Sequence, residues 1–458
     1  MQPNPDPESR ARERRRFVRA AAVLATIVGV CWFIAHSWWQ DTPPEPQRSA
    51  GPWADGVANA WPSRPESETP TALPRLPAPK DDEFELCGYG RVRSTGFELP
   101  LPVQSAANTT ILRWADQQVA SNSEVERARG LLLRARYGAA VAQEVFARKI
   151  ARETNDPLAC YTNDTCREQV RTLGEKSAQS DREALARLAS ATSDPTVYGL
   201  AMIECGSDVR RYDRGSCSLL SPDQWVRLDP GNGVPWMFIA AEAAARKDAS
   251  SRDEALMRVA AAQSLDMRWQ PILDAIVELG ELAPNDTERT VIQTSTVGVW
   301  AALPIPAYLP VMQACSPETI RDPARRELCG QLAQVLTERD TNVIGLALGA
   351  RIAERVGWPA ERIARLRDEV DAIQAFQQQI SFKHPIYGCA WSEELRKYSI
   401  QRARIGEVAM GRAQIRESGR TAAEWAAQWR AQRERERQRA TADDAAKSAA
   451  PPTPHPPK

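Results

Sequence analysis

"LDPGNGVPWMFIAAEAA", residues 228–244, joins an Asp-Pro pair to an apolar segment that is rich in alanine. Proline lacks an amide hydrogen and restricts the residue before it, so Asp229-Pro230 predicts a helix boundary. Apolar residues then recur three and four positions apart, which is typical of a helix with a buried face. Small alanine side chains let two such helices approach closely. The stretch therefore predicts a break followed by a closely packed helix.

This break recurs along the chain. Asp-Pro pairs begin at Asp156, Asp194 and Asp229, and Asp266 takes the next place without a proline. The successive intervals between these aspartates are 38, 35 and 37 residues. Each of the last two intervals contains two helical stretches. Two helices, a break and the same again is typical of an array of helical hairpins.

The hairpins resemble those of the tetratricopeptide repeat family. The matching positions in 229–266 are Trp236, Ile239, Ala240 and Ala243 in the first helix and Ala255, Val259 and Ala262 in the second. Tyr198 and Ala201 match in 194–229. The resemblance implies a right-handed solenoid of helical hairpins with a concave face that commonly binds proteins or peptides. It implies no chemistry.

The chain departs from the family pattern in several ways. Ala243 stands where the family has tyrosine, and no proline follows Asp266. The loop between the two helices of 229–266 is longer than usual, and the interval 156–194 matches mostly by spacing. The resemblance is therefore limited to residues 156–266.

Composition sets the fold class. The 458 residues include 59 Lys and Arg residues and 59 Asp and Glu residues. This balance argues against a protein that binds nucleic acid over its whole length, which would be basic. Alanine, arginine, leucine and glutamate favour helices, and no sustained alternation of polar and apolar residues predicts strands. We therefore expect an all-α fold.

The N-terminal segment predicts a membrane anchor. Arginines crowd residues 10–19, an apolar run follows, and Trp38 and Trp39 come after it. Residues 17–39 are long enough to form one transmembrane helix. Arginine clusters stay in the cytoplasm and tryptophan favours the membrane interface. We expect a single-pass protein of the bacterial inner membrane, with residues 1–16 cytoplasmic and the bulk of the chain periplasmic.

Two other interpretations of this segment stay open. Ala35 and Ser37 are small enough to precede a signal-peptidase cut, which would release the chain. Cys31 could carry a lipid, although Val30 stands where such a site has a small residue.

The cysteines predict disulfides. Cys31 lies in the membrane segment, and the eight that follow are even in number, as expected for exported cysteines that pair. Proximity in sequence suggests the pairs Cys160–Cys166, Cys205–Cys217 and Cys315–Cys329, which leaves Cys87–Cys389. The connectivity stays open, because eight cysteines allow many pairings and some could be free buried thiols.

Composition also divides the chain. Residues 40–82 carry a proline every few positions and predict a disordered linker. Residues 83–400 predict a disulfide-braced helical repeat domain, in which 297–315 is a proline-rich irregular connection. Residues 401–440 predict a charged helix, whose alternating Arg and Glu favour a solvated face. Residues 441–458 predict a disordered tail.

No catalytic, cofactor or metal motif is present. His384 near Cys389 does not make a metal site, and no nucleophile motif or phosphate-binding loop occurs. Glu204 and Glu242 lie on predicted helices and are the candidate acids if the chain were a cell-wall enzyme. An isolated glutamate on a helix is usually exposed or paired with a cation, so we expect no enzyme.

The predicted function is therefore a scaffold that binds an unknown protein or peptide in the cell envelope. The sequence gives no reason to expect a cofactor, a metal ion or a nucleic acid. A peptidoglycan-processing enzyme and a purely architectural envelope protein are the alternatives.

Overall fold

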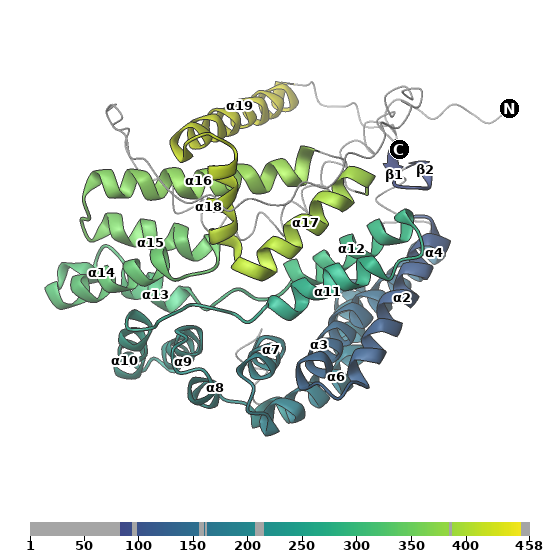
Figure 1. Cartoon of the computed structure of the whole chain (residues 1–458), viewed down its shortest axis with the longest axis horizontal. Helices are drawn as coiled ribbons and strands as arrows, with labels where there is room; N and C mark the ends of the chain where they lie inside the picture. The colour runs from purple at the N-terminus through teal and green to yellow at the C-terminus, as the bar shows by residue number, and fades with distance from the viewer. Residues whose placement is uncertain are drawn as a thin grey trace, which may run out of the picture. The chain divides into compact units, whose positions relative to one another are not determined.

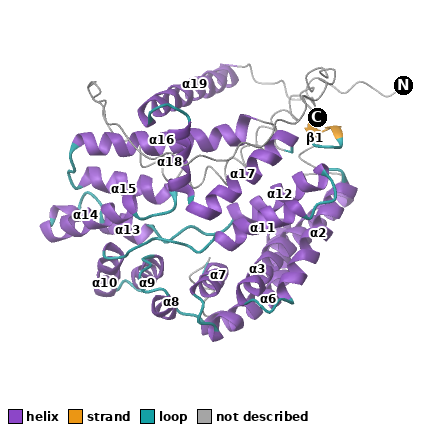
Figure 2. Cartoon of the chain, in the orientation of Figure 1, coloured by secondary structure: helices purple, strands orange, loops and turns teal. Residues whose placement is uncertain are grey.

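The structure, a computed structural model, describes residues 83–93, 99–154, 160, 163–206, 215–383 and 387–449. These residues are nearly all helical, as expected (Figure 2). The strands β1 (Glu83–Leu86) and β2 (Gly90–Arg93) form a two-stranded sheet. No helix of the described residues combines the length and apolarity that a bilayer crossing needs. The predicted anchor at 17–39 and the predicted linker lie outside the described residues.

The first helices are α2 (Leu101–Val119), α3 (Glu124–Leu133), the π-helix η1 (Arg134–Gly138), α4 (Ala139–Thr154), α6 (Asp164–Ala191), α7 (Pro195–Cys205), the 3-10 helix η2 (Gly215–Leu219) and α8 (Pro222–Leu228). The middle helices are α9 (Val234–Ala245), α10 (Ala249–Ala260), α11 (Gln270–Glu281), α12 (Asp286–Ala301) and α13 (Leu309–Ala314). The last are η3 (Thr319–Arg321), α14 (Pro323–Glu338), α15 (Val343–Arg355), α16 (Ala360–Lys383), α17 (Cys389–Ile405), α18 (Glu407–Glu417) and α19 (Ala422–Ala449).

The two intervals after Asp194 each form a pair of helices, α7 with α8 and α9 with α10. Asp194 ends the preceding loop, and its carboxylate accepts a hydrogen bond from the Thr196 amide at 2.7 Å. Proline follows in the first turn, where its missing amide hydrogen costs nothing. Trp225 of α8 is fully buried, with its ring centroid 5.7 Å from that of Phe238 in α9. The Asp-Pro pairs thus mark real boundaries between packed helices.

The interval 156–194 is different. The spacing of the Asp-Pro pairs extends the repeat to this interval, but residues 164–191 form the single helix α6. Asp156 lies outside the described residues. Gly174 lies inside α6, where a Cβ atom would clash with the Gln143 side chain of α4. The extension of the repeat to this interval is wrong, because no break divides residues 164–191 into two helices.

The loops between helices are joined to one another. The Gly233 amide donates to the Ser264 carbonyl at 2.8 Å, and the Leu265 amide donates to the Arg339 carbonyl at 3.2 Å. The Glu407 amide then donates to the Thr341 carbonyl at 3.1 Å. These bonds link the loops that precede α9, α11, α15 and α18. We call this set of joined loops, residues 229–233, 263–268, 339–342 and 405–408, the loop ladder.

The helical pairs do not pack in the order of the chain. The α11–α12 pair follows α10 in sequence, yet it contacts α2 and α17, while α14 contacts α10. Helices α14, α15 and α16 then lie side by side (Figure 1). Contacts such as α2 with α12 and α11 with α17 are therefore long-range in sequence.

The C-terminal boundaries differ from those predicted. The predicted domain end at 400 falls inside α17, and residues 401–440 form three helical segments rather than one. Trp425 and Trp429 are buried in a cluster with Val370 and Ile373 of α16. The apolar face that these two tryptophans form covers α16. In the sequence this face is hard to recognise, because charged residues surround both tryptophans. The predicted disordered tail is also wrong in part, because α19 continues to Ala449; residues 450–458 lie outside the described residues.

Candidate functional site

The eight cysteines beyond residue 82 form four pairs, as the order in the sequence suggested. The pairs and their Cα–Cα distances are Cys87–Cys389 at 4.7 Å, Cys160–Cys166 at 4.8 Å, Cys205–Cys217 at 5.6 Å and Cys315–Cys329 at 5.7 Å. These distances suit disulfides. The first pair joins residues 302 positions apart and ties β1 and its turn to α17. Cys31 lies outside the described residues.

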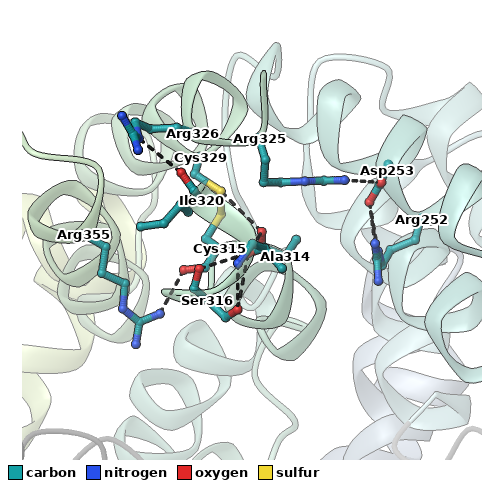
Figure 3. Close-up of a disulfide and its surroundings, with 11 residues drawn as sticks. Arg252, Asp253, Ala314, Cys315, Ser316, Ile320, Arg325, Arg326, Cys329 and Arg355 are labelled. Atoms are coloured by element: carbon teal, nitrogen blue, oxygen red, sulfur yellow. Dashed lines mark hydrogen bonds and ion pairs between the residues drawn. A yellow bond between two sulfur atoms is a disulfide. The ribbon is translucent and has the colours of Figure 1, made fainter. Parts of the chain in front are cut away.

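Figure 3 shows the Cys315–Cys329 disulfide between the end of α13 and α14. Arg355 of α15 donates to the Cys315 carbonyl at 3.0 Å. On the other side, Arg325 of α14 pairs with Asp253 of α10. The disulfide therefore lies in a region where four helices are fastened by side chains as well as by sulfur.

The residues that matched the repeat pattern lie mostly inside the fold. The buried ones are Tyr198, Ala201, Ala240, Ala243, Ala255, Val259 and Ala262. Trp236 and Ile239 are partly buried against the same apolar cluster. The Tyr198 hydroxyl accepts the Ser221 amide hydrogen at 2.9 Å, which ties α7 to the first residue before α8. These residues therefore hold the helices together.

Glu204 is the buried acid that the sequence pointed to, with its side chain only 2% exposed. Arg136 donates its Nε hydrogen to one carboxylate oxygen at 2.5 Å, and Arg182 donates to the other at 3.1 Å. Both oxygens of this carboxylate are therefore engaged by arginine side chains inside the protein. Glu242 is half-buried on α9, and burial raises its pKa. The two glutamates lie in different surroundings and make no acid–base pair in the described structure.

A cavity of about 290 Å³ lies beside Arg136. Helices α2, α4 and α12 and the π-helix η1 form its walls. Its polar lining residues are Gln104, Arg136, Tyr137, Glu144 and Ser295. The rest of the lining is small and apolar: Ala140, Val141, Gly298, Val299 and Ala302. We call this cavity the η1 pocket.

The π-helix explains how two polar residues reach this pocket. A π-helical turn inserts an extra residue into a helix and is frequent at functional sites. Here it joins α3 to α4, and it places Arg136 and Tyr137 in the same wall. The Tyr137 hydroxyl donates to the Asn108 side chain at 2.5 Å, and burial raises the pKa of Tyr137 to about 12. Tyr137 is therefore a neutral hydrogen-bonding group at physiological pH.

The Arg136 guanidinium is incompletely paired. Its Nη1 donates to the Ala302 carbonyl at 3.2 Å, but its buried Nη2 has no partner among the described residues. Glu144 is more exposed, with its side chain 39% accessible, and it pairs with Arg148 one turn later. The η1 pocket is thus lined by the cation Arg136, whose unpaired Nη2 is buried, and by the carboxylate of Glu144, which pairs with Arg148.

The sequence did not identify this pocket. Residues 125–153 predict one uninterrupted helix, and Arg136 and Tyr137 carry no motif. The one local signal is Gly138, because a glycine inside a helical pattern often has a packing or functional reason. The described residues contain no cluster of three or more potential metal ligands.

No family model, no curated protein and no solved structure matches this chain.

Proposed function

We propose that the chain is a single-pass protein of the bacterial inner membrane whose helical domain binds another protein or a peptide in the periplasm. In this proposal residues 17–39 form the anchor and residues 40–82 the linker. Residues 194–266 are the tetratricopeptide-like part of the domain, with the two pairs α7–α8 and α9–α10 as its hairpins.

The observation that carries the proposal is the η1 pocket on a braced helical frame. Ligand pockets are mostly apolar, with a few placed polar groups, and occur between packed helices. A volume of about 290 Å³ is at the small end of that range and suits one or two side chains of a larger partner. Four disulfides and the loop ladder stiffen the frame around it, and disulfides suit an oxidising compartment.

The surroundings of Glu204 favour binding over catalysis. A cell-wall hydrolase that uses one glutamate needs an acid that can give up its proton near the substrate. Glu204 is buried and held by Arg136 and Arg182, so both of its oxygens are occupied and a substrate does not reach them. This argument supports the scaffold over the peptidoglycan enzyme.

Site-specific photo-crosslinking of the full chain in its membrane tests the scaffold. A crosslinking amino acid is placed at Val145, which is 64% exposed and one turn beyond the pocket residue Val141. Met257, 54% exposed on α10, is the matched control. We expect a discrete protein adduct at Val145 and a weaker one or none at Met257. Adducts at neither position would favour the architectural alternative.

Reporter fusions test the proposed topology. Alkaline phosphatase fused after residue 449 is expected to be active, since the proposal puts that end in the periplasm. An inactive alkaline phosphatase fusion would mean that this end lies in the cytosol, which would contradict the proposed orientation.

A further inference from the structure

We propose that the loop ladder is a pH-sensitive joint, which stays closed while Asp340 carries a proton and opens when Asp340 ionises. By opening we mean loss of the hydrogen bonds that residues 339–342 make with the loops on either side. This inference does not depend on the proposed function, because it rests on contacts within the ladder alone.

Asp340 lies in the middle of the ladder. On one side, the Leu265 amide donates to the Arg339 carbonyl at 3.2 Å. On the other side, the Thr341 carbonyl accepts the Glu407 amide hydrogen at 3.1 Å. The residues immediately before and after Asp340 thus make both connections, so a displacement of Asp340 disturbs the two together.

The ladder contains four acidic residues, and they differ in their counter-charges. Arg268 pairs with Asp229 at 2.8 Å and with Asp266 at 3.4 Å. Arg402 pairs with Glu407 at 3.0 Å. The fourth acid, Asp340, forms no ion pair with any described residue.

Neutral groups are the recorded donors to the Asp340 carboxylate. The Asn342 amide donates to one oxygen at 2.8 Å and the Tyr308 hydroxyl donates to the other at 2.9 Å. The neighbouring Arg339 side chain donates to the Ala262 carbonyl instead. The negative charge of an ionised Asp340 is therefore not compensated in the closed ladder.

Tight packing of α15 against Asp340 hinders hydration of that charge. The Asp340 residue is 7% exposed. A Cβ atom added at Gly345 in α15 would clash with the Asp340 carboxylate, so the helix backbone takes the place of solvent on this side. An ionised carboxylate needs a cation or water around it. Movement of residues 339–342 towards solvent would supply the water.

The start of α15 does not replace the missing cation. Free amide hydrogens at a helix N-terminus favour an anion. Here the Val343 amide donates to the Glu407 carboxylate at 3.0 Å. The Ile344 amide donates to the Asn342 side chain at 2.8 Å. These two amides of the helix start are thus already used by other acceptors.

The expected pH range follows from the two protonation equilibria. Burial, together with the nearby carboxylates of Glu407 and Asp266, raises the pKa of Asp340 to about 7 in the closed ladder. In the open ladder we expect the ordinary pKa of about 3.9. Opening therefore releases a proton between these two values, and the open form gains as pH rises from about 4 to about 7. From pH 5 to pH 8 the equilibrium constant of opening is expected to rise roughly 50- to 100-fold.

Hydrogen exchange followed by mass spectrometry on the full chain in detergent tests the inference. Peptides that contain Leu265, Thr341 and Glu407 report opening, once each rate is corrected for the intrinsic exchange rate at its pH. A peptide from α6 is the reference, because this helix lies outside the ladder. We expect the rise in the ladder peptides and little change in α6.

Three variants separate the joint from a general effect of pH on the fold. Asp340→Asn, which cannot ionise, should remove most of the rise. Asp253→Asn is the matched control, since this acid on α10 pairs with Arg325 outside the ladder, and the rise should stay as in the natural chain. Tyr308→Phe removes a hydrogen bond that favours the ionised form, so the rise should continue to a higher pH.

An unchanged rise in Asp340→Asn, an equal rise in α6 and in the ladder, or no rise in the natural chain would each overturn the inference. If Asp340→Asn does not fold, Tyr308→Phe decides. A rise that levels off at the same pH in Tyr308→Phe as in the natural chain would also overturn it.

Discussion

Asn232 and Asp266 are joined by two hydrogen bonds across the loop ladder. The Asn232 side-chain amide donates to the Asp266 carbonyl at 2.7 Å, and its side-chain oxygen accepts the Asp266 amide hydrogen at 3.1 Å. Asn232 is fully buried. The same side chain also accepts the Val234 amide hydrogen, so it both starts α9 and fixes the next loop. A recurrent break in the sequence thus becomes a connection between successive helical pairs.

Asn232→Ala is expected to destabilise the fold by about 2–5 kcal/mol, because two backbone amide hydrogens lose their acceptor inside the protein. Urea denaturation followed by circular dichroism measures the change. Asn285→Ala is the control: Asn285 also accepts a backbone hydrogen, from Glu288, but at an exposed helix start, where the loss is about 1 kcal/mol. If both variants lose the same free energy of unfolding, the hydrogen bonds of Asn232 to the next loop contribute nothing beyond capping of a helix.

Glu204→Gln is expected to lower the free energy of unfolding by about 2–4 kcal/mol, since it leaves two partly buried guanidinium groups without a counter-charge. Glu242→Gln should change it by less than about 1 kcal/mol, because burial already disfavours the charged form of that half-exposed group. Thermal and urea midpoints measure both. If the Glu204→Gln variant unfolds at the same midpoints as the natural chain, the ion pair between Glu204 and Arg136 does not stabilise the fold.

The disulfides are tested by alkylation of the denatured protein without reductant. We expect no labelling at the eight cysteines beyond residue 82, and labelling of all eight after reduction. The Cys87→Ser/Cys389→Ser double variant should lose about 3–5 kcal/mol of stability, because the bond closes a loop of 302 residues. The Cys160→Ser/Cys166→Ser double variant, with a separation of 6, should lose less.

Asp340 makes stability depend on pH. Burial raises the pKa of this carboxyl group to about 7, although Asn342 and Tyr308 donate hydrogen bonds to it. A raised pKa means that the favourable contribution is complete below the ordinary value of about 3.9 and is lost as pH rises through about 7. Asp340→Asn, which stays neutral, should therefore gain about 1–3 kcal/mol over the natural chain at pH 8. The difference should shrink towards pH 5 in thermal melts.

Asp253→Asn is expected to lower stability at pH 8, whereas Asp340→Asn is expected to raise it. Partial burial acts against ionisation of Asp253, but hydrogen bonds from Arg325 and Arg252 hold its pKa below the ordinary value. Its contribution is present above about pH 4 and lost in acid, so this variant should be less stable than the natural chain at pH 8. If both substitutions stabilise the protein at pH 8, the gain from Asp340→Asn does not come from the ionisation of a buried carboxyl group.

Much of the helical pattern was predictable from single residues. The Asp-Pro pairs located the starts of α7 and the loop before α9, and the order of the cysteines suggested the four pairs. The error at 401–440 arose because Trp425 and Trp429 stand among charges, yet bury one helix face. The error at 156–194 arose because the repeat was extended there from the spacing of the Asp-Pro pairs alone, whereas the helix runs on without a break.

The η1 pocket was not predictable. Arg136 and Tyr137 come from a π-helical turn, whereas Ser295 and Gly298 come from α12, more than a hundred positions later. No local pattern relates these residues. Only the contact between α2 and α12, which the order of the chain gives no reason to expect, brings the walls together.

The sequence by itself determined the helical class, the places where helices begin and the cysteines available for pairing. These depend on backbone restrictions and spacings that act within a few residues. The tertiary structure decided that α11 and α12 leave the row of neighbouring pairs, that the loops join through Asn232, and that Arg136 lines a cavity together with residues of α2 and α12. Those outcomes depend on which apolar faces meet over long separations, and packing at that range has no local code.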